Sequence, residues 1–409
     1  MPRIGPAYRR RSLGSSRSLC VDPRAPIHPP RPPPEPLLSN SPRVVVDATA
    51  VPADRGGVGR YVDELLPALQ AEGADLAVVC QAHDVEHYRR LLPGVELLAA
   101  PAAIARRPAR LAWEQVGLPL LARRARADVL HCPHYTMPLA GGLPVVTTLH
   151  DATFFTHPDV HLAVKRRFFQ TWTRISLARA ARCVTPSAAT RDELVRVAGA
   201  DPARIDVAHL GVDAARFHVP SAEERAAVRA HLGVTGPYLA FLGTLEPRKN
   251  VPALVRGWSA LTDPPALVLA GGRGWDTEVD VAAADVPAGH RLLRPGYLPL
   301  EMLAGFLGEA ELVVYPSLGE GFGLPVLEAM ASGAPVLTTP RLSLPEVGGD
   351  AVAYAEPDAP ALTAALRELL ADPARRAELA AAGQVRAAGF DWRACARAHR
   401  ASYAAAAAA

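Results

Sequence analysis

The chain of 409 residues is long enough for two domains of ordinary size, each with its own hydrophobic core. Its hydrophobic content of 49% and charged content of 21% are typical of globular proteins, and no apolar run is long enough to cross a membrane. Residues 1–42 carry a net charge of +5, so the formal charge of +3 leaves 3 − 5 = −2 for the rest. A nucleic-acid-binding fold would need a basic face, which this near-neutral remainder does not suggest, and we expect no nucleic-acid partner.

Residues 1–41 are predicted to form a disordered tail. They are rich in proline, serine and arginine, and so cannot bury enough apolar surface to fold. No apolar core follows the first arginines, so the segment is not a secretory signal. The five cysteines are scattered and lack the spacing of a zinc site, which favours a reducing compartment. We therefore expect a cytoplasmic location.

Residues 42–213 are predicted to form an N-terminal α/β domain. Mostly apolar runs predict strands at 43–47, 76–80, 129–131, 145–149, 183–185 and 205–208. Helical stretches lie between many of them, and this alternation favours a parallel, doubly wound, Rossmann-like sheet. A loop with Gly56, Gly57 and Gly59 follows the first strand. It lacks the G-x-G-x-x-G spacing of a dinucleotide fingerprint, but its bare backbone would let a ligand approach.

Three further features of this half each have two interpretations. Trp113-Glu114-Gln115 either belongs to an acceptor surface or is a buried tryptophan with polar neighbours. His150, at the end of a strand, either pairs with a backbone carbonyl or reaches a ligand, while Asp151 is expected to orient the loop. The arginine clusters at 106–110, 123–126 and 165–167 are either solvated helix faces or a contact with a membrane surface.

Residues 214–236 are more polar and are predicted to be a linker with a short helix. A second Rossmann-like domain is predicted over 237–388, with strands at 238–243, 266–270, 291–293, 312–315 and 336–338. Helices are expected at 360–371, 373–387 and 392–406, the last within a C-terminal segment of residues 389–409. Ligands bind at the carboxyl ends of such strands, so two facing sheets would hold the site in the cleft between them.

Arg248 and Lys249 follow the first strand of the second domain, within Gly243-Thr244-Leu245-Glu246-Pro247-Arg248-Lys249-Asn250. Arginine offers a forked contact and lysine a compact charge, which together suit a diphosphate. A solvated charge pair is the alternative. Lys249 is one of only two lysines among 44 basic residues, which favours the ligand role.

The run from Gly319 to Met330 follows the predicted strand at 312–315. Glycines at 319, 321 and 323 permit a tight turn, and the helix that begins near Leu324 offers unpaired N–H groups to a phosphate. The carboxylates of Glu320 and Glu328 are unsuited to phosphate, and they suit ligand hydroxyl groups that donate hydrogen bonds. A sugar joined through phosphates to a nucleoside would satisfy all these groups, whereas a solvated loop is the alternative.

This run, continued through Ala334-Pro335-Val336, resembles the glutamate–seven residues–glutamate motif of retaining glycosyltransferases of the GT-B fold, specifically family 4. The resemblance covers about residues 43–390 and implies two Rossmann-like domains facing across a cleft, with the last helix crossing back to the N-terminal domain. Trp113-Glu114-Gln115 is similar to a subset that includes mannosyltransferases. The resemblance thus implies retaining transfer of a sugar, with mannose from GDP-mannose as our specific expectation, to a saccharide or lipid-linked acceptor by an enzyme peripheral to the membrane.

The resemblance also implies roles for individual residues. Glu320 lies by the donor sugar and steadies its developing positive charge, while Glu328 binds the ribose. Arg248 and Lys249 bind the diphosphate, and His150 points toward the donor sugar. The family places a glycine-rich loop before a helix that starts at Arg60-Tyr61. The remaining donor-binding residues implied are Gly57, Leu298 in the loop that reads the base, Gly321, Phe322, Gly323 and Leu324.

No two aspartates are separated by a single residue, so the D-x-D signature of metal-dependent glycosyltransferases is absent. We expect neither a metal nor another cofactor, because the nucleotide sugar is a co-substrate. Two other functions stay open: a GT-B nucleotide-sugar 2-epimerase and a non-catalytic nucleotide-sugar-binding protein. Product analysis without an acceptor separates the first from a transferase, and the intact set of site residues argues against the second.

Overall fold

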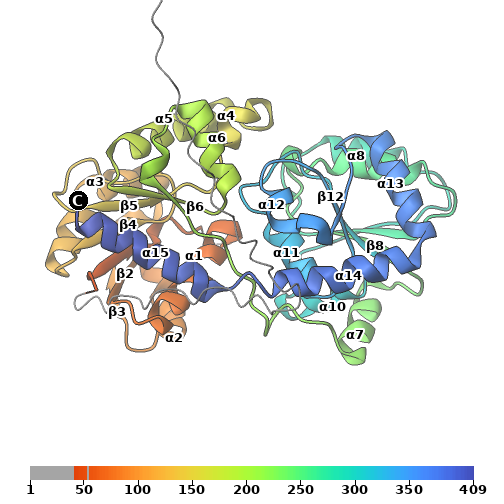
Figure 1. Ribbon diagram of the computed structural model, residues 1–409, viewed down its shortest axis with the longest axis horizontal. Helices are drawn as coiled ribbons and strands as arrows, with labels where there is room; N and C mark the ends of the chain where they lie inside the picture. The colour runs from red at the N-terminus through yellow and green to blue at the C-terminus, as the bar shows by residue number, and fades with distance from the viewer. Residues whose placement is uncertain (1–40, 53–54) are drawn as a thin grey trace, which may run out of the picture. The chain divides into compact units, whose positions relative to one another are not determined.

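The computed structural model describes residues 41–52 and 55–409, in which helices pack around two β-sheets (Figure 1). The predicted tail lies outside the described residues except for Ser41. The first sheet has seven parallel strands in the order β3-β2-β1-β4-β5-β6-β7. Its strands are β1 (Val44–Asp47), β2 (Leu76–Cys80), β3 (Glu96–Ala99), β4 (Val129–Cys132), β5 (Val145–Thr148), β6 (Arg182–Thr185) and β7 (Ile205–Val207).

The second sheet has six parallel strands in the order β10-β9-β8-β11-β12-β13. They are β8 (Tyr238–Leu242), β9 (Ala266–Ala270), β10 (Leu292–Gly296), β11 (Leu312–Tyr315), β12 (Val336–Thr338) and β13 (Ala353–Tyr354). The central strands are buried on both faces, as continuous apolar runs require when helices cover a parallel sheet. The expected α/β class with two doubly wound sheets is confirmed. The exact domain boundaries stay predictions.

The helices that accompany the first sheet and the linker are α1 (Gly56–Ala71), α2 (Val85–Leu91), α3 (Arg107–Arg124), α4 (Thr153–Thr156), α5 (Ala163–Arg179), α6 (Ala188–Ala198) and α7 (Ala222–Leu232). The linker helix α7 has strong local signals. Ser221 and Glu224 form a capping box at its start, and Gly233 ends it with φ +62°.

The later helices are α8 (Val251–Ser259), α9 (Glu278–Ala284), α10 (Leu303–Gly308), α11 (Leu324–Ala331), α12 (Leu344–Gly348), α13 (Ala359–Ala371), α14 (Pro373–Ala387) and α15 (Trp392–Ala407). Although α15 follows the second sheet, it packs along α1 and against strands β4 to β7 of the first (blue helix, Figure 1). The expected return of the last helix to the N-terminal sheet is thus confirmed. No helix within the described ranges has both the length and the apolar character needed to cross a bilayer.

Two expectations about local structure were wrong. Helix α1 begins at Gly56 rather than at Arg60, so its glycines form the first turn instead of a loop. Arg55 holds this turn in place, because its guanidinium bonds Asp63 at 2.5 Å and Asp84 at 2.9 Å. Strands β3 and β13 were not predicted. Both are partly exposed edge strands, so neither has the continuous apolar run of a buried strand.

Candidate active site

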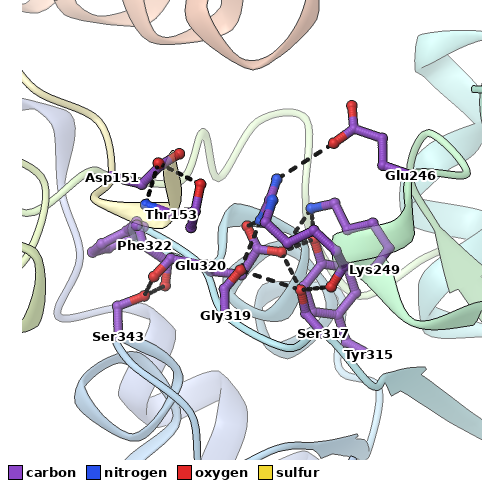
Figure 2. Close-up of polar contacts among 12 residues, drawn as sticks. Asp151, Thr153, Glu246, Lys249, Tyr315, Ser317, Gly319, Glu320, Phe322 and Ser343 are labelled. Carbon is purple, nitrogen blue, oxygen red and sulfur yellow. Dashed lines mark hydrogen bonds and ion pairs between the residues drawn. The ribbon is translucent and has the colours of Figure 1, made fainter. Parts of the chain in front are cut away.

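The glycine-rich loop after β11 places the Glu320 carboxylate among buried polar groups (Figure 2). Its Oε1 accepts hydrogen bonds from Lys249 Nζ at 2.8 Å, Ser317 Oγ at 2.6 Å and the Tyr315 hydroxyl at 3.1 Å. Its Oε2 is paired with Arg248 at 2.5 Å. Two motifs that are 71 residues apart in sequence therefore meet on one carboxylate.

Arg248 and Lys249 share the carboxylate of Glu320, and Glu246 lies 3.7 Å from Arg248. Burial tends to raise the pKa of Glu320, but Arg248 and Lys249 outweigh that effect and lower it to about 2. Burial lowers the pKa of Lys249 and the like charge of Arg248 lowers it further, while attraction to Glu320 and Glu246 does not fully compensate these effects. Burial acts on Arg248 in the same sense, but attraction to Glu320 and Asp151 raises its pKa above the usual value. A ligand with negative charge would compensate the burial of Lys249 that its present partners leave uncompensated.

Local backbone geometry explains the position of the two cations. A 3-10 turn, Pro247–Lys249, follows β8 and ends at Asn250, which has φ +56°. Asparagine tolerates this left-handed conformation better than most residues. The Asn250 side-chain amide donates to the carbonyls of Pro316 at 3.1 Å and Pro357 at 2.8 Å. These bonds fasten the turn to the loop that carries Glu320.

Gly321 lies where no larger residue would fit. A Cβ at this position would lie 1.8 Å from the carbonyl oxygen of His150. The Gly321 carbonyl accepts hydrogen bonds from Ser187 Oγ at 2.6 Å and Thr190 Oγ1 at 3.0 Å, both at the start of α6. The loop is therefore held by buried groups that follow β5 and β6 of the first sheet.

Ser343, which directly precedes α12, holds the rest of the loop, and the loop then leads into α11. Ser343 Oγ lies 2.7 Å from the Glu320 carbonyl and 2.8 Å from that of Phe322. Gly323 precedes α11 with φ +105°, and Leu324 is the first helical residue. The Phe322 ring is 3% exposed, so we expect any donor contact at this residue to come from its backbone.

Glu328 lies inside α11 and is 1% exposed. Its Oε1 is paired with Arg60 of α1, whereas its buried Oε2 has no hydrogen-bond partner among the described residues. Burial raises the pKa of this carboxyl, and Arg60 opposes the rise. A buried oxygen of this kind fits a hydroxyl donor, because an unpaired polar atom is otherwise costly to bury.

His150 makes the backbone contact that was one of its two interpretations. Its Nε2 lies 2.7 Å from the carbonyl of Pro133, and because a carbonyl only accepts, Nε2 carries the proton. Burial lowers the pKa of His150, so the ring is neutral at neutral pH and Nδ1 is its acceptor atom. Asp151 accepts bonds from the amide and hydroxyl of Thr153 at 2.9 and 2.7 Å, consistent with orienting the loop (Figure 2).

Gly57 and Leu298 lie apart from this hydrogen-bonded cluster. Gly57 is exposed in the first turn of α1, with open space around the position of a Cβ. Leu298 is half-buried after β10, next to the 73% exposed Tyr297. The contacts of the described residues join neither of them to Glu320, and their donor-binding roles stay predictions.

The Trp113-Glu114-Gln115 motif is largely a structural contact. Glu114 is 1% exposed and accepts hydrogen bonds from Arg110 at 2.8 Å and Thr136 at 2.7 Å. Gln115 bonds the Met137 carbonyl at 3.1 Å. The polar-neighbour interpretation accounts for Glu114, while Trp113 is half-buried.

Sequence reasoning missed two hydroxyl groups of the site, those of Tyr315 and Ser317. Tyr315 ends the predicted strand at 312–315, to which no site role was given, and Ser317 lies in the loop beyond it. Their place at the carboxyl end of a parallel strand is the signal that would have indicated them.

Within residues 41–52 and 55–409, no three His, Cys, Asp or Glu side chains are grouped so as to hold a metal ion. Metal independence stays a prediction.

Two family models match the chain. The model for Glycosyltransferase Family 4 covers residues 55–216, and that for Glycosyl transferases group 1 covers residues 224–386. The two matched segments fall on the two sheets described above.

Individual proteins resemble the chain over most of its length. It is 33% identical to O-antigen chain mannosyltransferase B of Escherichia coli over 296 residues, covering 70% of this chain and 75% of that protein. It is 31% identical to the glycogen synthase of Mycobacterium tuberculosis over 381 residues, covering 82% and 88%. The structure of Anabaena HepE in complex with UDP-glucose aligns with a TM-score of 0.70 at 17% identity, covering 88% of this chain and 98% of that one. This likeness confirms the expected fold.

Proposed function

Since this chain belongs to the family 4 glycosyltransferases of the GT-B fold, we propose that it uses a nucleoside-diphosphate sugar and transfers the sugar with retention. The acceptor is a hydroxyl of a saccharide or a lipid-linked saccharide. The observation that carries this proposal is the cluster in which two adjacent cations, Arg248 and Lys249, meet the buried carboxylate of Glu320. Two such cations at the carboxyl end of a parallel strand support a diphosphate as ligand.

The diphosphate would compete with Glu320 for both cations. Arg248 offers two parallel N–H donors and Lys249 a point charge, while the start of α11 offers backbone N–H groups. Negative charge grows on the diphosphate as the sugar leaves, and fixed cations stabilise that charge. A bound diphosphate would also raise the lowered pKa of Lys249 and keep it charged.

Glu320 is poorly suited to act as a nucleophile in a double displacement. Its oxygens are held by two cations and two hydroxyls, and its pKa of about 2 marks a weakly basic carboxylate. In our mechanism the acceptor hydroxyl attacks C1 from the face that the diphosphate leaves. The bond from C1 to the acceptor oxygen forms, the bond from C1 to the phosphate oxygen breaks, and the proton passes to that phosphate oxygen. Glu320 steadies the positive charge on the sugar.

The remaining roles follow from the acceptor atoms at the site. The unpartnered Oε2 of Glu328 accepts a bond from a ribose hydroxyl, and His150 Nδ1 accepts one from a hydroxyl of the donor sugar. Backbone groups complete the donor site at Gly57, Leu298, Gly321, Phe322, Gly323 and Leu324. The reaction in this form uses no metal and no other cofactor.

GDP-mannose is the proposed donor, and similarity to the mannosyltransferase of Escherichia coli supports this choice. A glycogen synthase is nearly as similar, so the donor has to be tested against other nucleotide sugars. We further propose a cytoplasmic enzyme that meets a lipid-linked acceptor at the membrane surface. The exposed basic residues of these N-terminal clusters, which exclude the buried Arg110, supply the positive charge that an anionic surface attracts.

Thermal unfolding with a panel of ligands tests the proposal. The panel is GDP-mannose, UDP-glucose, ADP-glucose and the three free diphosphates, because a ligand that binds only the native state raises the midpoint. We expect the largest rise with GDP-mannose, and none of that rise in Lys249→Met. A rise with another sugar nucleotide would reassign the donor, and no rise with any ligand would contradict the proposal. Proton NMR of the anomeric centre of the product then tests retention.

A further inference from the structure

A chain of buried hydrogen bonds connects α15 to α1 and to strands β4 and β5. The distances are 2.9 Å from the Tyr403 hydroxyl to His131 Nδ1 and 2.9 Å from His131 Nε2 to Thr148 Oγ1. They are 3.0 Å from Thr148 Oγ1 to the Tyr61 hydroxyl and 2.7 Å from there to His399 Nε2. All five side chains are at most 1% exposed.

The direction of each bond follows from one end of the chain. His399 Nδ1 lies 2.8 Å from the carbonyl of Cys395, which can only accept, so Nδ1 carries a proton. Burial lowers the pKa of His399 to about 4, so at neutral pH the ring has only this one proton. Nε2 is therefore an acceptor, and the hydroxyl of Tyr61 must donate to it.

The same reasoning settles the remaining bonds. Because the Tyr61 proton is used, its oxygen accepts from Thr148, and the oxygen of Thr148 then accepts from Nε2 of His131. Burial lowers the pKa of His131 well below its usual value, so this ring is also neutral and its Nδ1 accepts from Tyr403. Each donor of the chain is used, and only one arrangement of protons satisfies all of these bonds.

An inner member of the chain, Tyr61, contacts a residue of the active site. The ring of Tyr61 meets that of His150 edge-on, with centroids 5.0 Å apart and planes at 84°. Thr148, another member of the chain, is the last residue of β5, two positions before His150. Because the chain holds the Tyr61 ring in one position, that ring limits where the His150 ring can lie.

We propose that this chain positions His150, so that α15 contributes to sugar transfer without touching the substrate. Tyr61 and His399 are then positioning residues, and the inference rests on the proposed role of His150. An apolar contact would hold α15 in place equally well, because satisfied buried polar groups add little net stability over apolar ones. The chain of hydrogen bonds differs from an apolar contact because it holds each of its five side chains in a single orientation.

Tyr61→Phe is the informative variant, since it keeps the ring and deletes only the hydroxyl. Ser402→Ala is the matched control. Ser402 lies in the same helix, is 1% exposed and bonds Asp206 at 2.7 Å, but it is outside the chain. We expect Tyr61→Phe to lower kcat about tenfold with KM for the donor unchanged, as displaced catalytic groups do. We expect Ser402→Ala to stay within about twofold of wild type.

Nitrogen-15 NMR of the histidine rings gives a readout that needs no substrate. In the wild-type protein we expect protons on Nε2 of His131 and His150 and on Nδ1 of His399. In Tyr61→Phe the His150 signals should shift and broaden, and in Ser402→Ala they should not. Other tautomers, an unchanged His150 signal in Tyr61→Phe, or equal loss of kcat in both variants would overturn the proposal. An inactive wild-type protein would count against the proposed function. The NMR result would still show whether Tyr61 positions the ring of His150.

Discussion

Replacing Arg60 with glutamine should destabilise the protein by an amount that depends on pH. The change leaves Glu328, with 2% of its side chain exposed, without its cation, whereas the Arg60 side chain is itself 34% exposed and contributes little core packing. An unpaired carboxylate can take up a proton, which costs about 1.36 kcal/mol per pH unit above its unfolded pKa. With an unfolded value of 4.5, the loss is limited to about 3.4 kcal/mol near pH 7 and about 1.4 kcal/mol near pH 5.5.

The sign follows from the raised pKa of Glu328. A carboxyl with a raised folded-state pKa favours folding at low pH, and this benefit is lost as the pH rises through that value. The pKa rises further without Arg60, so the variant should come closest to wild type in acid.

Urea unfolding, followed by tryptophan fluorescence at both pH values, measures the difference. We expect the loss of unfolding free energy in Arg60→Gln to be larger near pH 7 than near pH 5.5, by at most about 2 kcal/mol, because the raised pKa of Glu328 in the wild type already accounts for part of this effect. The double variant Arg60→Gln with Glu328→Gln removes the titrating group, so its loss should hardly depend on pH. Equal losses in the single variant at both pH values would refute the reasoning.

Three further predictions concern transfer itself. Lys249→Met should lower kcat about 100-fold, as expected for loss of one group that stabilises the leaving charge. In the same assay of nucleotide release, the kcat of Lys165→Met, which removes the other lysine, should stay within about twofold of wild type. A similarly small loss of kcat in Lys249→Met would contradict the role of Lys249. Gly321→Ala places a Cβ 1.8 Å from a backbone carbonyl and should abolish transfer with the fold retained by circular dichroism, whereas Gly236→Ala, with open space around it, should be active. Because the pKa of Glu320 is about 2, kcat/KM between about pH 5 and pH 8 should show no inflection from it; an acidic limb in that range that vanishes in Glu320→Gln would disprove this.

Local patterns predicted most of the fold. A buried parallel strand is a continuous apolar run, so β1 and β11 were found almost to the residue, while the exposed edge strands β3 and β13 had no such run. The first turn of α1 was missed for a related reason. Glycine is a poor helix former, and the turn is held by the bonds of Arg55 to Asp63 in the same helix and to Asp84, 29 residues away, which propensity does not contain.

The predicted site residues were found as sequence motifs, but their partners were not. Glu320 meets Arg248 and Lys249 because β8 and β11 are neighbours in the sheet, an order that residue spacing does not reveal. Arg60 and Glu328 are 268 residues apart. Buried ion pairs of this kind depend on which elements pack together, so only the structure could reveal them.

The return of α15 has a consequence for the order of folding. His131 and Tyr403 are bonded across 272 residues, and Tyr61 is bonded to His399 across 338. Until α15 has been synthesised, the hydroxyl of Tyr61 and Nδ1 of His131 lack these partners. The N-terminal half therefore stays unfinished while the whole second sheet is made. Its final packing step follows the synthesis of the second sheet, so the first sheet to be synthesised is not the first to be completed.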